Sequence, residues 1–373
     1  MKILFSTDQT YLHGGIEKIM AAKANYLADL QGYEVHILTT EQKGNAPCYQ
    51  LSPKISQTDL AVNYHRQKSY FHPSNFVKIP GHFGKLSNAI KSIRPDIIIV
   101  CNYAFDFYRM PFIFKNIPKL KEYHSSGIVD AQAEANSGLL KRMIFSLNEF
   151  IASKYDRLVL LNPDEKSYYA SNNTVIIPNF VDVPDFRADL NAKKAIAAGR
   201  IAPVKGFENL IGAWKLVAAK HPDWQVHIYG QGEESYIGSL RNLIEDFGLE
   251  KNVFILPATN KLVEKMSEYS MCVMSSQTEC FPMVLLESLS VGLPIVSFDC
   301  ETGPRNIITN NEDGLLAKNQ NVEDLAAKII TLIDDVSLRK TMGSHAKTNV
   351  SRFSKSNVMA KWLDLFNELK SQN

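Results

Sequence analysis

The sequence predicts an α/β protein built from two doubly wound domains, each around a parallel sheet. Short β-branched runs alternate with segments of helical periodicity along the chain, and repeated strand–helix alternation is typical of doubly wound α/β folds. Several runs, such as Ile-Ile-Ile-Val at 97–100, lack polar alternation, as expected of strands covered on both faces. The 373 residues are too many for one ordinary core, so we expect two domains.

The expected strands are short apolar or β-branched runs bounded by turn residues. They lie at residues 2–6, 34–39, 96–102, 157–161, 174–177, 194–198, 225–229, 252–256, 271–275 and 294–298. Helical periodicity predicts helices that include residues 15–30, 207–220, 240–247 and 322–332. Near the end of the chain, an apolar stripe predicts one more helix; its residues are Val358, Trp362, Phe366 and Leu369.

The boundary between the domains is expected in the segment 177–184. Its two prolines, Pro178 and Pro184, suit an extended linker because proline disfavours helical backbone in the residue before it. A new apolar run at 194–198 then begins the strand–helix pattern again. We therefore expect a first domain over residues 1–180 and a second over residues 185–353.

Composition argues against several classes of function. Lys and Arg total 41 and Asp and Glu total 39, a net charge of +2, so the chain lacks the basic field expected of a nucleic-acid-binding protein. The five cysteines are scattered without a Cys-x-x-Cys pair, and we expect free thiols and no metal site. No apolar run approaches the roughly 20 residues of a spanning helix, and the N-terminus is typical of a buried strand, not a signal peptide. We expect a cytoplasmic protein whose membrane contact, if any, is peripheral.

The strongest candidate site is the segment 279–287, Glu-Cys-Phe-Pro-Met-Val-Leu-Leu-Glu. It follows an apolar strand and leads into a helix, where proline suits the first turn because its missing N–H costs nothing there. The free N–H groups of the helix start would bind a phosphate, and a glutamate flanks that start on either side. A nucleotide sugar carries both the phosphates and the hydroxyls that this arrangement would bind. The residues expected to bind it are Glu279, Phe281, Pro282, Met283, Val284, Leu285 and Glu287. The alternative is that Glu279 is a solvated loop residue and Glu287 a surface residue.

A second candidate is the segment 199–206, Gly-Arg-Ile-Ala-Pro-Val-Lys-Gly, between an expected strand and its helix. The Arg200 guanidinium can bind two phosphate oxygens at once, and Lys205 supplies a point charge. We favour neutralisation of a diphosphate over a solvated basic loop, because both cations follow the carboxyl end of a strand, as Glu279 does.

Two weaker candidates lie in the first half of the chain. Gly14 and Gly15 follow the first strand and open the first helix, but the full Gly-x-Gly-x-x-Gly fingerprint is absent, which argues against a standard dinucleotide site. A plain strand–helix turn explains the pair equally well. His124 precedes small polar residues at the expected end of a strand; a lone histidine is more often structural than catalytic.

Taken in order, these features resemble the retaining GT-B glycosyltransferases of glycosyltransferase family 4 over nearly the whole length. The matching features are Gly14-Gly15, His124, the linker Ile177-Pro-Asn179, Gly199-Arg200 with Lys205-Gly206, the pair Glu279 and Glu287, Gly292-Leu-Pro294, and Asp313-Gly-Leu-Leu316. The stretch 298–305 is similar to the bacterial branch that builds lipopolysaccharide, capsule or lipid-linked oligosaccharide.

The resemblance implies two Rossmann-like domains that face each other across a cleft. Residues 1–180 would bind the acceptor, residues 185–353 the nucleotide sugar, and residues 354–373 would return to the first domain. By this resemblance, Arg200 and Lys205 would bind the diphosphate, Glu279 the donor hexose hydroxyls and Glu287 the ribose. His124 would contact the donor sugar. Gly14 and Gly15 would let the backbone approach the phosphates. Cys280 departs from the glycine frequent at its position in the family, and Pro282 removes one amide donor.

The reaction implied is transfer of a hexose or N-acetylhexosamine from a nucleoside-diphosphate sugar, with UDP favoured, to a hydroxyl of a glycan or lipid-linked glycan, with retained configuration. We expect it to need no metal and no cofactor, and no Asp-x-Asp motif occurs. The residues expected at the reacting centre are Glu279, His124, Arg200 and Lys205. The alternatives are a GT-B-like nucleotide-sugar epimerase or phosphorylase, or a non-catalytic partner subunit of the same fold.

Two segments are candidates for acceptor contact. The stretch 63–85 is rich in rings that could stack on sugars or equally pack the domain: Tyr64, His65, Tyr70, Phe71, His72, His82 and Phe83. The segment 139–147 combines Lys141 and Arg142 with apolar residues, as in helices that lie on anionic membranes. A core helix with a solvated basic edge is the alternative.

Overall fold

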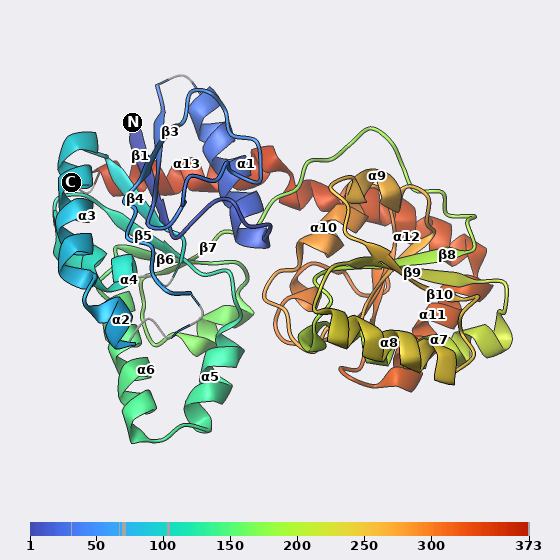
Figure 1. Ribbon diagram of the computed structural model, residues 1–373. Helices are drawn as coiled ribbons and strands as arrows, with labels where there is room; N and C mark the ends of the chain where they lie inside the picture. The colour runs from blue at the N-terminus through green and yellow to red at the C-terminus, as the bar shows by residue number, and fades with distance from the viewer. Residues whose placement is uncertain (31, 67, 69–71, 103–104, 372–373) are drawn as a thin grey trace. The chain divides into compact units, whose positions relative to one another are not determined.

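The computed structural model describes residues 1–373 apart from 31, 67, 69–71, 103–104 and 372–373 (Figure 1). The chain forms two compact units, one made of Met1–Ile177 and Met359–Asn373 and the other of Pro178–Val358. Residues 178–180 and 354–358 therefore lie with the second unit, whereas the sequence placed them with the first. The Val181 N–H donates to the Phe353 carbonyl (3.0 Å), which fixes this part of the linker within the second unit.

The first unit contains a parallel sheet in the order β3-β2-β1-β4-β5-β6-β7. Its strands are β1 (Lys2–Thr7), β2 (Glu34–Thr39), β3 (Ser56–Asp59), β4 (Ile97–Val100), β5 (Lys119–Glu122), β6 (Arg157–Leu160) and β7 (Thr174–Ile176). The order runs outward in both directions from β1 and β4. In such doubly wound sheets, ligands bind beyond the carboxyl ends of the strands.

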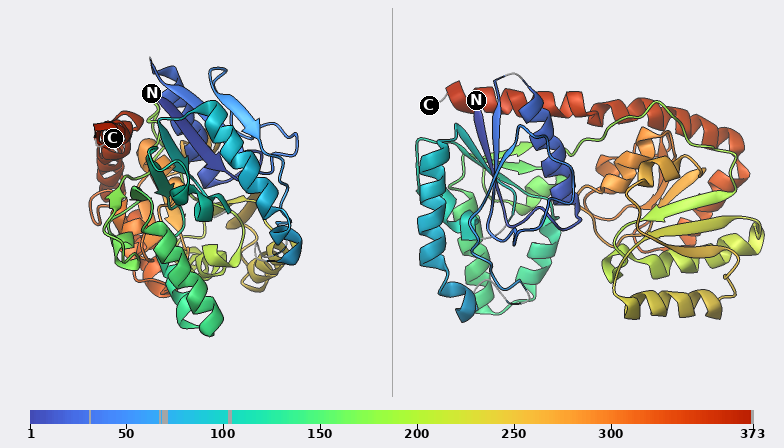
Figure 2. Two further views of the ribbon diagram at one scale, coloured as in Figure 1. Left: turned by 90° about the vertical axis from the view of Figure 1, so that its left-hand side faces the viewer. Right: turned by 45° about the horizontal axis from the view of Figure 1, so that its top comes forward.

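Helices cover both faces of this sheet. They are α1 (Gly15–Asp29), α2 (Pro73–Phe76), α3 (Ile79–Ile93), α4 (Phe105–Arg109), α5 (Gly127–Ala135), α6 (Leu139–Ala152) and the end of α13 (Lys355–Ser371). Leu86 of α3, Phe107 of α4 and Ile151 of α6 pack in one cluster with β4 and β6. On α1, Lys23 lies over the rings of Phe5 in β1 and Trp362 in α13. The hairpin of α5 and α6 extends beyond the sheet (Figures 1 and 2).

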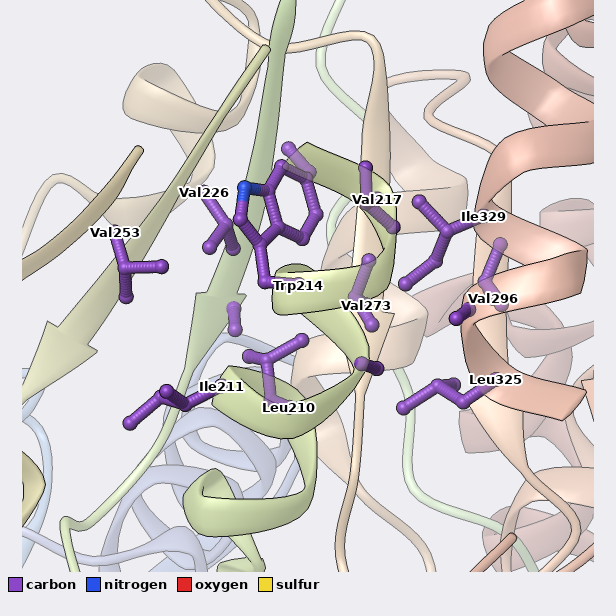
Figure 3. Close-up of a cluster of buried hydrophobic side chains, with 14 of the residues drawn as sticks. Leu210, Ile211, Trp214, Val217, Val226, Val253, Val273, Val296, Leu325 and Ile329 are labelled. Atoms are coloured by element: carbon purple, nitrogen blue, oxygen red, sulfur yellow. The ribbon is translucent and has the colours of Figure 1, made fainter. Parts of the chain in front are cut away.

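The second unit contains a parallel sheet in the order β10-β9-β8-β11-β12-β13. Its strands are β8 (Lys194–Ala198), β9 (Gln225–Gly230), β10 (Val253–Pro257), β11 (Met271–Met274), β12 (Ile295–Phe298) and β13 (Gly314–Ala317). Its helices are α7 (Phe207–Lys220), α8 (Glu234–Asp246), α9 (Leu262–Met266), α10 (Met283–Ser290), α11 (Val322–Asp334) and α12 (Val336–Asn349). Trp214 of α7 is completely buried against the sheet (Figure 3).

The predicted α/β fold with two parallel, doubly wound sheets is confirmed, but β3 and β13 were missed, and β5 was expected only as a strand of unstated bounds before His124. β3 has the polar sequence Ser-Gln-Thr-Asp and is exposed at the sheet edge, so it carries no apolar signal. β5 has the sequence Lys-Leu-Lys-Glu, yet all four residues are buried. β13, Gly-Leu-Leu-Ala, is short and contains no β-branched residue. The expected helical segment 240–247 overlaps only the second half of α8, which begins at Glu234.

Candidate active site

Two neighbouring strands of the second unit, β8 and β11, carry the predicted site on the loops at their carboxyl ends. The two loops are hydrogen-bonded to each other, because the Gln277 N–H donates to the Val204 carbonyl (2.9 Å) and the Ser275 hydroxyl to the Lys205 carbonyl (3.1 Å). Gly206 closes the first loop with φ at +59°, and a Cβ atom there would lie 2.3 Å from the Ser275 carbonyl oxygen. The close approach of the loops therefore requires glycine at position 206.

Lys205 and Glu279 meet at this junction. The Lys205 Nζ lies 2.5 Å from Glu279 Oε1, and the Ser276 hydroxyl donates to the same oxygen (2.7 Å). The Lys205 side chain is 25% exposed and the Glu279 side chain 12%. A ligand can therefore reach the pair from solvent, and water only partly screens the two charges. Glu279 is therefore no solvated loop residue. The second carboxylate oxygen, Oε2, accepts no hydrogen bond from any residue that the structure describes.

A third loop braces Glu279 from the neighbouring strand β12. The Glu279 N–H donates to the Glu301 carbonyl (3.0 Å), and the N–H groups of Thr302 and Gly303 donate to the Glu279 carbonyl (2.7 and 2.8 Å). A Cβ atom on Gly303 would lie 2.7 Å from the Pro282 ring, so the loop packs against the start of α10. From the sequence, the stretch 298–305 was linked only to a resemblance. Its supporting role was not predicted, because it depends on the strand order of the sheet.

The start of α10 differs in detail from the prediction. Pro282 is the residue before the first helical turn, with extended backbone, and its carbonyl accepts from the Leu285 N–H (3.1 Å). The Leu285 amide was expected to be free, but it is hydrogen-bonded. The N–H groups of Met283 and Val284 remain as donors at the helix start. Phe281 is buried with its ring 5.5 Å from that of Phe353, so its side chain packs within the unit.

Glu287 lies in α10 and is buried, with only 4% of its surface exposed. The alternative of a surface residue is therefore wrong. Burial, and to a smaller extent the negative charge of Glu287, raises the pKa of the Cys272 thiol on β11 to about 12.

Arg200 follows β8 and is exposed. Its guanidinium forms no ion pair or side-chain hydrogen bond within the part of the chain that the structure describes. Arg200 is therefore available to an anionic ligand, whereas the charge of Lys205 is already shared with Glu279.

His124 follows β5 in the first unit, and its environment keeps it neutral. Its Nε2 lies 3.2 Å from a carboxylate oxygen of Glu122. Burial, with the nearby charges of Lys23 and Lys121, lowers the pKa of His124 to about 3. Since a carboxylate can only accept, Nε2 carries the proton and Nδ1 keeps a free lone pair. His124 can therefore accept a hydrogen bond from a hydroxyl but cannot act as an acid.

A buried charged cluster supports His124. Glu122 forms an ion pair with Lys23, and the Lys121 ammonium donates to the Glu122 carbonyl (2.6 Å). Burial lowers the pKa of each lysine to about 7. The Lys23 Nζ also lies 3.8 Å from the centre of the Trp362 ring, which joins α13 to the cluster. These residues were not predicted from the sequence, where the charged run before His124 was the available signal.

Gly14 and Gly15 precede and open α1, as predicted. A Cβ atom on Gly14 would lie 2.3 Å from the Glu17 carboxylate, whereas the space above Gly15 is open. Burial raises the pKa of Glu17, and Gln9 donates a hydrogen bond to it. A carboxylate thus lies at this helix start, beside the position where a phosphate was expected.

The predicted acceptor segments have different surroundings. Tyr64 and His82 are buried, and the Tyr64 hydroxyl lies 2.8 Å from His82 Nδ1, while His82 Nε2 lies 2.6 Å from Asp106. These two rings therefore pack the domain. Tyr70 and Phe71 lie outside the described residues. In α6, an apolar stripe faces solvent; its exposed residues are Leu139, Met143, Leu147 and Phe150.

The described part of the chain holds no group of three or more His, Cys, Asp or Glu residues arranged to bind a metal ion. All five cysteines are free thiols. Within the same residues, no helix has both the length and the apolar character needed to cross a bilayer.

Two family profiles match the chain. Residues 13–184 match the family described as Glycosyltransferase Family 4, and residues 182–349 match Glycosyl transferases group 1. An uncharacterized glycosyltransferase of Haemophilus influenzae is 28% identical over 359 residues, which are 94% of this chain and 95% of the relative. A poly(ribitol-phosphate) alpha-N-acetylglucosaminyltransferase of Staphylococcus aureus is 27% identical over 90% of this chain and 70% of the relative.

Solved structures share the fold across the chain. A sucrose-phosphate synthase from Thermosynechococcus elongatus superposes with a TM-score of 0.83 at 19% identity, covering 100% of both chains. A mutant of TarM from S. aureus, in complex with fondaparinux, alpha-GlcNAc-glycerol and UDP, gives a TM-score of 0.79 at 18% identity over 98% of this chain and 99% of that one. The two family profiles meet at the linker between two parallel, doubly wound sheets, and the chain belongs to the GT-B glycosyltransferases of family 4 type.

Proposed function

We propose that the protein transfers a hexose or N-acetylhexosamine from a UDP-sugar to a hydroxyl of a glycan or lipid-linked glycan in surface polysaccharide biosynthesis, with retention of configuration. The observation that carries this proposal is the junction of Lys205 and Glu279 at the carboxyl ends of β8 and β11. Glu279 lies four residues before Met283, where α10 begins, and Arg200, which has no side-chain partner among the described residues, lies on the same loop as Lys205. These groups together suit a ligand with phosphates and hydroxyls.

The diphosphate would be bound by Arg200, by Lys205 and by the N–H groups of Met283 and Val284. Negative charge grows on the leaving phosphate as the bond to the sugar breaks, and one preorganised donor at such a position is worth about 3–4 kcal/mol. Because Glu279 already shares the charge of Lys205, Arg200 supplies the larger uncompensated charge. We propose that this neutralisation needs no metal and no cofactor.

Glu279 would bind a donor hydroxyl through Oε2, because Oε1 accepts from Lys205 and Ser276. The same contacts argue against a double displacement, since a carboxylate in an ion pair is a poor nucleophile. We propose a front-face route instead. The bond from the anomeric carbon to the phosphate oxygen breaks with its electron pair on the phosphate. The acceptor oxygen bonds to that carbon on the same face, and its proton passes to the leaving phosphate.

The roles proposed for three other residues follow from their surroundings. Glu287 would bind the ribose. Because Glu287 is buried, only a ligand that lies directly against α10 could contact it. His124 would accept a hydrogen bond from a sugar hydroxyl at Nδ1. The open space above Gly15 suits close approach of a ligand to the backbone at the start of α1.

The relatives support the donor class. The S. aureus relative is named for alpha-N-acetylglucosamine transfer and one of Bacillus subtilis for alpha-glucose transfer. Structural neighbours were solved with UDP, and one with UDP-glucose. An α-linked product is the one that retention gives from an α-linked nucleotide sugar. We therefore propose UDP-glucose or UDP-N-acetylglucosamine as the first donors to test.

The test is an incubation of the full chain with each UDP-sugar, followed by proton NMR with and without a glycan acceptor. The proposal expects UDP release that rises with acceptor and an α-anomeric product. A new nucleotide-sugar isomer without acceptor would instead identify an epimerase, and turnover only with inorganic phosphate would identify a phosphorylase. A chain that binds UDP but releases none with any donor would be a non-catalytic subunit.

We also propose peripheral contact with the inner face of the cell membrane. The exposed apolar stripe of α6 is accompanied by Lys141 and Arg142, both exposed. Apolar residues flanked by cations suit the surface of an anionic bilayer, where a lipid-linked acceptor would lie.

A further inference from the structure

A pocket in the first unit lies between α5, α6 and the loop after β6. It is small, with a volume of about 80 Å³, and it is partly open to solvent. Tyr123, which lines it, is the neighbour of His124 in the sequence and follows β5. The pocket is therefore at the same carboxyl edge of the sheet as the histidine, but on residues that no proposed role uses.

Aromatic rings form one part of the wall. Tyr123, Phe145, Tyr168 and Tyr169 line the pocket, and the rings of Tyr123 and Tyr169 lie 4.7 Å apart, centre to centre, at 55°. The loop that carries the two later tyrosines is fixed to α5, because the Gly127 N–H donates to the Glu165 carboxylate (2.7 Å). The wall is thus held in place by the helix start.

Carboxylates form the other part of the wall. Asp130 and Glu134 of α5 and Glu149 of α6 line the pocket. None of the three side chains forms an ion pair or accepts a hydrogen bond within the described part of the chain, and none of the described lining residues is Lys, Arg or His. The wall therefore offers hydrogen-bond acceptors and uncompensated negative charge.

An amide completes the polar groups. Asn148 also lines the pocket, and the Tyr108 hydroxyl donates to its Oδ1 (2.8 Å). This bond fixes the orientation of the amide and leaves its NH₂ group as a donor. The apolar stripe of α6 is a separate surface, because Leu139, Met143, Leu147 and Phe150 do not line the pocket.

We propose that this pocket binds an uncharged or amino sugar residue of the acceptor glycan and excludes phosphate-bearing acceptors. Aromatic faces stack on the apolar faces of sugar rings, carboxylates accept from their hydroxyls or ammonium groups, and a wall of three unpaired carboxylates repels phosphate. The inference rests on the proposed glycosyl transfer, since it gives the acceptor class. It separates this chain from its relatives of S. aureus and B. subtilis, whose names specify poly(ribitol-phosphate) and poly(glycerol-phosphate).

The test uses the full chain with ¹³C-labelled alanine, because Ala131 and Ala152 line the pocket. Their methyl resonances are followed while methyl glucoside, glucosamine or glucose 6-phosphate is added, with UDP present throughout. We expect both methyl groups to shift with methyl glucoside and glucosamine and not with glucose 6-phosphate. No shift with either of the first two sugars, or an equal shift with the phosphate, would overturn the proposal.

Variants assign the binding to the carboxylates. Asp130→Asn combined with Glu149→Gln should weaken glucosamine binding at least tenfold and admit glucose 6-phosphate. Asp364→Asn is the matched control, because Asp364 is an exposed carboxylate of α13 outside the pocket. It should change neither the binding of glucosamine nor the exclusion of glucose 6-phosphate. An unchanged double variant would contradict the proposal. UDP binding is measured separately by thermal shift. A chain that binds sugars but not UDP would contradict the proposed donor and would support the pocket. A chain that binds UDP but not sugars would contradict only the pocket.

Discussion

At the scale of residues, the site depends on how charges are shared. Lys205 and Glu279 neutralise each other, Arg200 stays free, and His124 is kept neutral by burial beside Glu122. The first of these states joins residues that are 74 positions apart in the sequence. The chemistry assigned to them can therefore be tested by single substitutions.

Lys205→Ala should lower turnover about 10²–10³-fold, because a donor to the leaving phosphate is lost. The partly exposed ion pair with Glu279 contributes little to folding, so the free energy of unfolding should change by less than about 1 kcal/mol. Steady-state kinetics and urea unfolding measure the two effects. Lys193→Ala, which breaks an exposed ion pair with Asp223 in the same unit, is the control and should leave turnover unchanged. Normal turnover in the Lys205 variant would refute its role.

His124→Gln should make the protein less sensitive to acid. Burial lowers the pKa of His124 to about 3 from 6.5. Between pH 6.5 and pH 3, His124 is therefore protonated in the unfolded chain and neutral in the folded protein. Stability attributable to this residue is therefore full above pH 6.5 and is lost as the pH falls toward 3. Between pH 7 and pH 5 the variant should lose up to about 2 kcal/mol less than the wild type, measured by urea unfolding. His345→Gln, an exposed residue of α12, should behave as the wild type; equal losses in all three proteins would contradict the account.

At the scale of elements, the loops after β8, β11 and β12 act as one support for the start of α10. Gly206 permits the contact between the first two, and Gly303 lies against Pro282 in the third. The hairpin of α5 and α6 carries two different surfaces, a polar pocket and an exposed apolar stripe. Both arrangements place function on loops and helix ends held by a rigid sheet.

Gly206→Ala should destabilise the second unit by at least about 1–2 kcal/mol, the cost of left-handed backbone for a residue with a Cβ, and should lower activity. The clash with the Ser275 carbonyl oxygen at 2.3 Å adds to this cost. Gly238→Ala is the matched control, because Gly238 lies within α8 with open space around it and alanine favours helix. Thermal unfolding should therefore shift down for the first variant and up for the second. A Gly206 variant as stable as the wild type would show that the loops do not need this contact.

Leu139→Glu combined with Met143→Glu should abolish sedimentation with anionic liposomes at low salt without unfolding the protein, because both residues are exposed. Leu216→Glu, an exposed leucine of α7, should sediment as the wild type does. A wild-type protein that fails to bind the liposomes would remove the membrane proposal, and circular dichroism checks that the variants are folded.

At the scale of the whole molecule, the apolar strands, the two sheets and the linker segment could be predicted from the sequence, because buried parallel strands carry a strong local signal. The bounds of β5 could not, because its two lysines are buried by tertiary contacts that no local pattern shows. For the site, the residue types and the strand–loop–helix setting were available locally. The ion pair of Lys205 and Glu279, the free state of Arg200 and the bond from Leu285 to Pro282 arise only on folding, so the sequence could not distinguish free from paired groups.

The central claim is that a nucleoside diphosphate binds at the junction of β8, β11 and α10, with Arg200 as its main uncompensated cation. Titration calorimetry of UDP against the full chain and its Arg200→Ala and Lys193→Ala variants tests it most directly. The account predicts that UDP binds the wild type and the Lys193 variant equally and binds the Arg200 variant at least tenfold more weakly. Equal affinity in all three proteins, or no binding to the wild type, would contradict it.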